Sequence, residues 1–139
     1  MLICDSGPIL AALSRRDARH QACVELLQRF SEELALPAPV VTETALFLAR
    51  SYGPEAHLRF LESVASAELE VLDLEPVDHR RVAELCRHYA DLPLDQVDAS
   101  VVALAERLGQ RQIASLDVRH LGVVRLSDGR FLELLPDAS

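Results

Sequence analysis

The sequence predicts an α/β fold built on a mostly parallel sheet, and two observations support this prediction. Short apolar runs of strand length alternate along the chain with longer segments of helical periodicity. Half of the residues are apolar and about a quarter are charged, which is typical of a globular protein with a buried core. Strands that alternate with helices favour parallel pairing, because each helix returns the chain to the start of the next strand.

We expect one domain over residues 1–139, since no linker, internal repeat or low-complexity tract divides the chain. The strand patterns cover residues 2–4, 33–37, 69–74, 112–117, 122–126 and 131–135. The helical patterns cover residues 8–16, 17–30, 39–53, 54–66, 75–92 and 95–109. Asp17 and Asp95 suit the N-caps of their helices, and Gly53 and Gly109 suit helix ends. The buried stripe of the last helix is expected to comprise Val97, Val101, Leu104, Ala105 and Leu108.

The charge pattern excludes several classes of protein. The formal net charge is −8, and every cationic side chain is arginine. Without lysine, the chain cannot form a Schiff base, a phosphate-binding P-loop or the lysine site of a receiver domain. The acidic balance argues against tight nucleic-acid binding by bulk charge alone. It leaves open a nuclease whose acidic groups are masked by cations.

Features of membrane and secreted proteins are not expected. No apolar run is long enough to span a bilayer, and no signal-peptide pattern opens the chain. The three cysteines, Cys4, Cys23 and Cys86, lie far apart without a paired spacing, which is typical of reduced and buried thiols. We therefore expect a cytoplasmic protein.

Four acidic residues occupy positions where α/β sheets bind ligands. Asp5 and Asp117 follow predicted strands, and Glu43 and Asp98 fall in the first turns of predicted helices. Ligands of open α/β sheets bind beyond the carboxyl ends of the strands, so these acids are expected to converge. Clustered carboxylates repel one another unless a cation neutralises them. Oxygen ligands without a nearby histidine indicate Mg²⁺ or Mn²⁺ and not zinc.

Each acid also has a purely structural interpretation. Asp98 could pair with Asp95 in a helix cap, Glu43 could favour the positive end of a helix dipole, and an aspartate after a strand is often a turn former. The five histidines show no metal-binding spacing and are expected on solvated helix surfaces. Ser6 has no evident base, so a nucleophilic serine is not expected.

Five stretches of the sequence resemble the PIN-domain ribonucleases, and in particular their VapC-type toxin branch. They are "CDSGPILAAL", "RRDARH", "PAPVVTETALFLARSYG", "YADLPLDQVDASVVALAERLG" and "IASLDVRHLGVVR". The resemblance covers nearly the whole chain, and the third and fourth stretches are the specific ones. It assigns the metal-binding and catalytic acids to Asp5, Glu43, Asp98 and Asp117, with the hydroxyls of Ser6 and Ser115 holding the carboxylates in place.

The resemblance implies a three-layer α/β/α fold, a homodimer and an endoribonuclease that depends on Mg²⁺ or Mn²⁺. Members of this branch are toxins that cut transfer or ribosomal RNA, and a cognate antitoxin holds them inactive. Their products carry a 5′-phosphate and a 3′-hydroxyl. An alternative is a catalytically silent module that binds an antitoxin-type partner through its acidic pocket.

The chain departs from the family pattern after Asp117. Many relatives carry a second acid three residues later, whereas this chain has His120. The missing carboxylate leaves one metal or two as open alternatives. His120 could contact a substrate phosphate or could be a partly buried structural residue.

Overall fold

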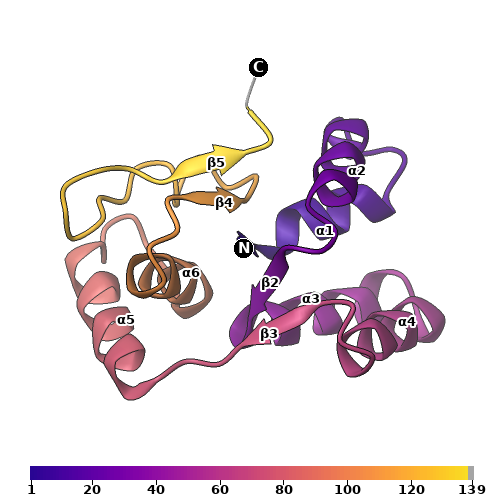
Figure 1. Cartoon of the computed structure of the whole chain (residues 1–139), viewed down its shortest axis with the longest axis horizontal. Helices are drawn as coiled ribbons and strands as arrows, with labels where there is room; N and C mark the ends of the chain where they lie inside the picture. Colours follow the sequence, from indigo (N-terminus) through magenta and orange to yellow (C-terminus); the bar gives the residue numbers. More distant parts are fainter. Residues whose placement is uncertain (138–139) are drawn as a thin grey trace.

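The computed structural model of the chain describes residues 1–137, and its elements alternate as predicted (Figure 1). The strands are β1 (Leu2–Cys4), β2 (Leu34–Pro37), β3 (Glu70–Leu72), β4 (Gln112–Ala114) and β5 (Glu133–Leu135). The helices are α1 (Ser6–Leu13), α2 (His20–Arg29), α3 (Ala38–Ser51), α4 (Pro54–Ala65), α5 (Pro76–His88) and α6 (Gln96–Arg107). Among the described residues, no helix has the length and apolar character needed to cross a membrane.

The strands form one parallel sheet in the order β3-β2-β1-β4-β5. The chain moves from β1 to one edge through β2 and β3, and then returns past β1 to β4 and β5. Because parallel crossovers are right-handed, α1 to α4 cover one face of the sheet and α5 and α6 cover the other. Figure 1 shows these two groups of helices on opposite sides of the sheet. The structure is therefore the expected three-layer α/β/α sandwich.

The core is built around β1 and α6. All three residues of β1 are buried, as expected for a central parallel strand covered on both faces. In α6 every residue from Ala99 to Ala105 is buried, because the helix packs against α5, α3 and β2. The predicted single stripe therefore understated its burial, and Val97 and Leu108 at its ends are only partly buried.

The ends of α6 confirm the predicted boundaries. Asp95 Oδ1 accepts a hydrogen bond of 2.9 Å from the amide of Asp98, so Asp95 is the N-cap. Gly109 follows the helix with φ of +66°, a conformation that glycine adopts without steric penalty. The amide of Gln110 then donates to the carbonyl of Ala105 at 2.8 Å, which completes a Schellman motif.

The three cysteines are free thiols, and two of them are fully buried. Cys4 and Cys23 lie in the core, while Cys86 is only partly buried, in contrast to the prediction. Burial raises the pKa of both Cys4 and Cys23, so both side chains stay protonated near neutral pH. They act as small apolar core residues.

The predicted N-cap of the second helix and one predicted strand were wrong. Asp17 does not cap α2; its Oδ1 accepts from the amide of Arg19 at 2.8 Å in a turn, and the helix begins at His20. The Asp17 carboxylate therefore makes its hydrogen bond within this turn, before the helix starts. Residues 122–126 do not form a strand, and only Arg125 makes an isolated bridge, to Phe131. The apolar pattern of this segment arises because the loop packs on the core, where Val124 is fully buried.

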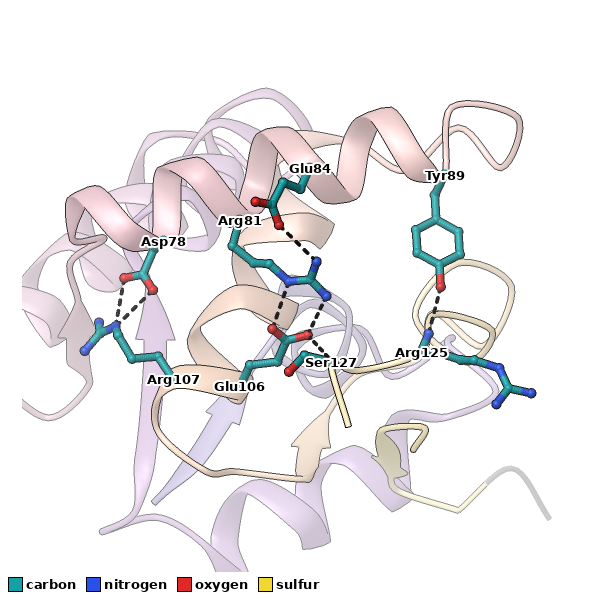
Figure 2. Close-up of polar contacts among 8 residues, drawn as sticks. All are labelled: Asp78, Arg81, Glu84, Tyr89, Glu106, Arg107, Arg125 and Ser127. Atoms are coloured by element: carbon teal, nitrogen blue, oxygen red, sulfur yellow. Dashed lines mark hydrogen bonds and ion pairs between the residues drawn. The ribbon is translucent and has the colours of Figure 1, made fainter. Parts of the chain in front are cut away.

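Arginine–carboxylate pairs fasten α5 to α6 (Figure 2). Arg107 Nε donates to both oxygens of Asp78, at 2.9 and 3.0 Å, and Asp78 is only 2 % exposed. Arg81 donates from Nε and Nη2 to the two oxygens of Glu106, each at 2.9 Å. Glu106 also accepts from the amide of Ser127 at 3.1 Å, which ties the loop after β4 to the same network.

The loop after β4 has a second attachment to α5. The amide of Arg125 donates to the hydroxyl of Tyr89 at 2.9 Å (Figure 2).

Burial by itself raises the pKa of Asp78, but the hydrogen bond and charge of Arg107 outweigh it and leave this pKa below its ordinary value. The Asp78–Arg107 pair therefore stabilises the charged form of a buried carboxylate.

We predict that Arg107→Met lowers the free energy of unfolding at pH 7, because it leaves the Asp78 carboxylate buried without its cation. The folded-state pKa of Asp78 lies below the unfolded value, so the contribution of the pair is complete above about pH 4 and is lost as the pH falls through the folded pKa. Urea denaturation at pH 7 and pH 3 measures both effects.

Arg59→Met is the matched control, because Arg59 pairs with Glu55 on the surface with both side chains more than three quarters exposed. This control should change the free energy of unfolding by less than about 0.5 kcal/mol. Equal losses in the two variants, or a loss in Arg107→Met that persists undiminished at pH 3, would contradict the assigned role of the pair.

Candidate active site

The candidate site lies where the strand order reverses. From β1 the chain proceeds to β2 on one side and returns to β4 on the other, so the loops after β1 and β4 diverge and open a crevice at the carboxyl ends of these strands. A pocket of about 390 Å³ occupies this place. Its lining comprises Asp5, Ser6, Gly7, Glu43, Asp95, Asp98, Leu116, Asp117 and His120.

Asp5 is the most firmly held acid of the pocket. It is only 7 % exposed and is the N-cap of α1, with Oδ1 accepting from the amide of Ser6 at 2.9 Å. Its Oδ2 accepts from the hydroxyl of Ser115 at 2.9 Å. The amide of Asp5 donates to the carbonyl of Ala114 at 2.8 Å. Backbone and side chain are thus both fixed relative to the end of β4.

Ser115 links the ends of the two central strands. Its side chain is buried. The hydroxyl oxygen accepts a hydrogen bond from the amide of Asp117 at 3.1 Å, and the same hydroxyl donates a hydrogen bond to Asp5. β4 ends at Ala114, so Asp117 lies three residues beyond the strand. The prediction that Asp117 ends this strand was therefore wrong. The intervening residues turn out of the sheet and bring Asp117 to the rim of the pocket.

Glu43 reaches the pocket from α3. It lies in the second turn of the helix, so the prediction that it belongs to the first turn was wrong. The hydroxyl of Ser6 donates to Glu43 Oε2 at 2.9 Å. The hydroxyls of Ser6 and Ser115 thus each donate to one carboxylate, that of Glu43 and that of Asp5 respectively.

Asp98 enters the pocket from the first turn of α6 and carries a strongly shifted pKa. The pKa of Asp98 is raised to about 7, mainly by burial and also by the negative charges of Asp95, Asp117 and Asp5, while His120 acts in the opposite direction. The pKa of Asp5 is also raised, again mainly by burial, although the hydrogen bonds from Ser6 and Ser115 counteract this. Protonation of either carboxyl relieves the repulsion within the pocket.

His120 also lines the pocket, and its sequence context left open a contact with a substrate phosphate or a structural role. Its Nδ1 lies 3.0 and 3.1 Å from the two carboxylate oxygens of Asp117, and its amide donates to Asp117 Oδ1 at 3.0 Å. It is partly buried, which agrees with one of the two alternatives stated for this residue; the general expectation that the histidines lie on solvated helix surfaces was wrong for it. The signal in the sequence was the spacing of Asp117 and His120, which places both on one side of a turn.

The donor set of this pocket fits a divalent cation. Ligand atoms of Asp98, Asp117 and His120 lie within 4.8 Å of one another, and Asp5 and Glu43 line the same cavity. Within residues 1–137, no arginine lines the pocket to neutralise these acids. Oxygen-rich sites of this kind suit hard divalent ions. The premise that no histidine is near the acids does not hold, because His120 belongs to the cluster.

The chain is similar to known proteins both in sequence and in fold. It is 28% identical over 131 residues to Ribonuclease VapC26 of Mycobacterium tuberculosis, a match that covers 94% of this chain and 97% of that protein. The structure is similar to VapC20 of the same organism, a sarcin-ricin loop cleaving toxin, with a TM-score of 0.73, 19% identity, and coverage of 81% and 87% of the two chains.

A further similar structure is DNA-bound VapBC from Salmonella typhimurium, with a TM-score of 0.69, 15% identity, and coverage of 96% and 97% of the two chains. At these identities the structural likeness supports the fold. The family model described as PIN domain matches residues 2–125, which include every residue that lines the pocket. The chain therefore belongs to the PIN domain family.

Proposed function

We propose that this chain is a divalent-metal-dependent endoribonuclease that acts as the toxin of a toxin–antitoxin pair. The observation that carries the proposal is the convergence of four carboxylates, Asp5, Glu43, Asp98 and Asp117, in one pocket at the switch point of a PIN-domain sheet. The similarity to Ribonuclease VapC26 over nearly the whole chain supports RNA as the substrate.

The proposed metal is Mg²⁺ or Mn²⁺. Asp5 and Asp98 would hold it most directly, and Glu43 and Asp117 would bind directly or through water. The cluster of Asp98, Asp117 and His120 supports a metal ion beside Asp98, because ligand atoms of these three residues lie within 4.8 Å of one another. When bound, the ion lowers the pKa of a water molecule and neutralises charge on the phosphoryl oxygens.

The protein side chains would orient the reacting groups. Asp5 keeps its position through the Ser6 amide and the Ser115 hydroxyl, so substrate binding need not order it. Glu43 is exposed and uses one oxygen to accept from Ser6. Its other oxygen would hold the attacking water in line with the scissile phosphate. Hydrolysis in this geometry leaves a 5′-phosphate and a 3′-hydroxyl.

The proposed substrates are transfer or ribosomal RNA, and the proposed partners are a cognate antitoxin and a second copy of the chain. The description of VapC20 as a sarcin-ricin loop cleaving toxin supports a structured RNA. The similarity to VapBC supports an antitoxin partner. Neighbouring helices α3 and α4 carry the exposed apolar side chains Leu46, Phe47, Leu58 and Leu61, which supports an apolar contact with another protein chain.

We predict that Asp98→Asn reduces Mn²⁺-dependent RNA cleavage at least about 100-fold, since an amide cannot replace the negative ligand. EDTA should abolish cleavage by the wild type. Asp91→Asn is the matched control, because Asp91 is an exposed acid nearby in the sequence and does not line the pocket. Gel analysis of total RNA incubated with each purified protein measures the rates.

Cleavage that survives EDTA, or that Asp98→Asn leaves unchanged, would rule out this mechanism. Absence of cleavage by the wild type with Mg²⁺ and with Mn²⁺, together with tight binding of an antitoxin-type peptide, would instead support the silent binding module. DNA substrates assayed beside the RNA decide which nucleic acid is cut.

We also predict that Asp98→Asn raises the melting temperature of the metal-free protein near neutral pH. The folded-state pKa of about 7 lies above the unfolded value of about 4, so the wild type loses stability as the pH rises from 4 through 7. The variant lacks this loss, so the difference in melting temperature between the variant and the wild type should grow as the pH rises through that interval. Thermal unfolding in EDTA at pH 5 and pH 8 measures it. An equal gap at both pH values would show that repulsion at Asp98 is not the cause.

A further inference from the structure

We propose that His120 is a ligand of the metal site and that its imidazole nitrogen makes this site prefer Mn²⁺ to Mg²⁺. The inference rests on the metal-binding part of the proposed function and adds a nitrogen donor to it. It concerns one side chain and the identity of the ion, and it does not depend on which RNA is cut.

The position of the histidine ring supports the inference. His120 offers a ligand atom within 4.8 Å of ligand atoms from both Asp98 and Asp117. Asp98 comes from α6, and the other two come from the turn after β4, so two separate parts of the chain meet at this point. Ligand atoms within 4.8 Å of one another can all contact a single ion.

The turn that carries His120 is fixed by its own backbone. The amide of Leu121 donates to the carbonyl of Asp117 at 3.0 Å, and the amide of Gly122 donates to the carbonyl of Val118 at 3.1 Å. A Cβ at position 122 would collide with the Val118 carbonyl, so glycine is required for the turn to close. The main-chain geometry of this turn therefore holds His120 beside Asp117.

The chemistry of the ring supports the choice of ion. A neutral imidazole carries one N–H, which can donate to a carboxylate, and one nitrogen lone pair, which can bind a metal. Mg²⁺ takes oxygen ligands and retains most of its water, whereas imidazole suits first-row transition ions. Replacement of one carboxylate oxygen by a nitrogen therefore shifts preference away from Mg²⁺, and Mn²⁺ is the ion of this class closest to it in chemistry.

The competing role is that of a positioning residue. In that case Nδ1 donates to Asp117 and holds its carboxylate, while the ion contacts oxygen atoms alone. Both roles predict weaker metal binding when His120 is replaced. They differ in one observable, which is magnetic coupling between bound Mn²⁺ and a protein nitrogen.

The experiment uses the full-length chain loaded with Mn²⁺ and pulsed electron paramagnetic resonance. We expect ¹⁴N modulation from a directly bound imidazole in the wild type and in Arg119→Gln, the control at an exposed neighbouring residue. The modulation should disappear in His120→Gln. Titration calorimetry should show that His120→Gln weakens Mn²⁺ binding about tenfold or more and changes Mg²⁺ binding much less. His120→Asp should bind Mg²⁺ more tightly than His120→Gln does.

Bound Mn²⁺ without ¹⁴N modulation in the wild type would overturn the inference and leave the nuclease proposal intact. Equal losses of Mn²⁺ and Mg²⁺ affinity in His120→Gln would also overturn it. Asp98→Asn provides the separate check on the site itself: if its Mn²⁺ affinity equals that of the wild type, the ion binds elsewhere and the proposed function fails together with the inference. Circular dichroism of each variant confirms that it is folded.

Discussion

The register of β1 against β4 is the constraint on which the candidate site depends. Cys4 pairs with Ala114, so the next residue of each strand, Asp5 and Ser115, emerges at the same edge of the sheet. The hydrogen bond between them joins the two loops that open the pocket. A slip of one residue would turn every side chain of β4 to the opposite face and would remove Ser115 from Asp5. Burial of Ile113 and Ala114 in the core opposes such a slip.

The molecule separates the charges that stabilise it from those that serve the pocket. On the outer side of α6, Arg107 and Arg81 neutralise Asp78 and Glu106, and the pKa of Asp78 is lowered. At the start of the same helix, Asp98 faces other acids and its pKa is raised. The charges at the C-terminal end of α6 are thus compensated by ion pairs, whereas the negative charge of Asp98 at its N-terminal end is not. Stability lost at the pocket is offset by packing and ion pairing elsewhere, as is common for functional sites.

Much of the fold and part of the site could be predicted from local sequence signals. Asp95 was identifiable as a cap because it precedes a long apolar pattern, and Asp5 was identifiable as an acid at the end of a strand because it follows a short apolar run. The role of His120 stayed open between two alternatives, because it depends on the turn after β4, which no periodicity reveals. Residues 122–126 were misassigned because loop packing on a core produces the same apolar pattern as a strand. Only tertiary contacts distinguish a strand from a packed loop at residues 122–126 and define the surroundings of His120.

The central place of β1 has a consequence for the order in which the protein matures during synthesis. Asp5 directly follows β1, which is synthesised before the other strands of the sheet, yet its hydrogen-bond partner Ser115 lies 110 positions later in the chain. Contacts of such long sequence separation form late, because a large loop must close first. Three of the four acids are present before β4 emerges, but the pocket remains without the strand that fixes Asp5. The growing chain thus carries an incomplete site until its central sheet closes.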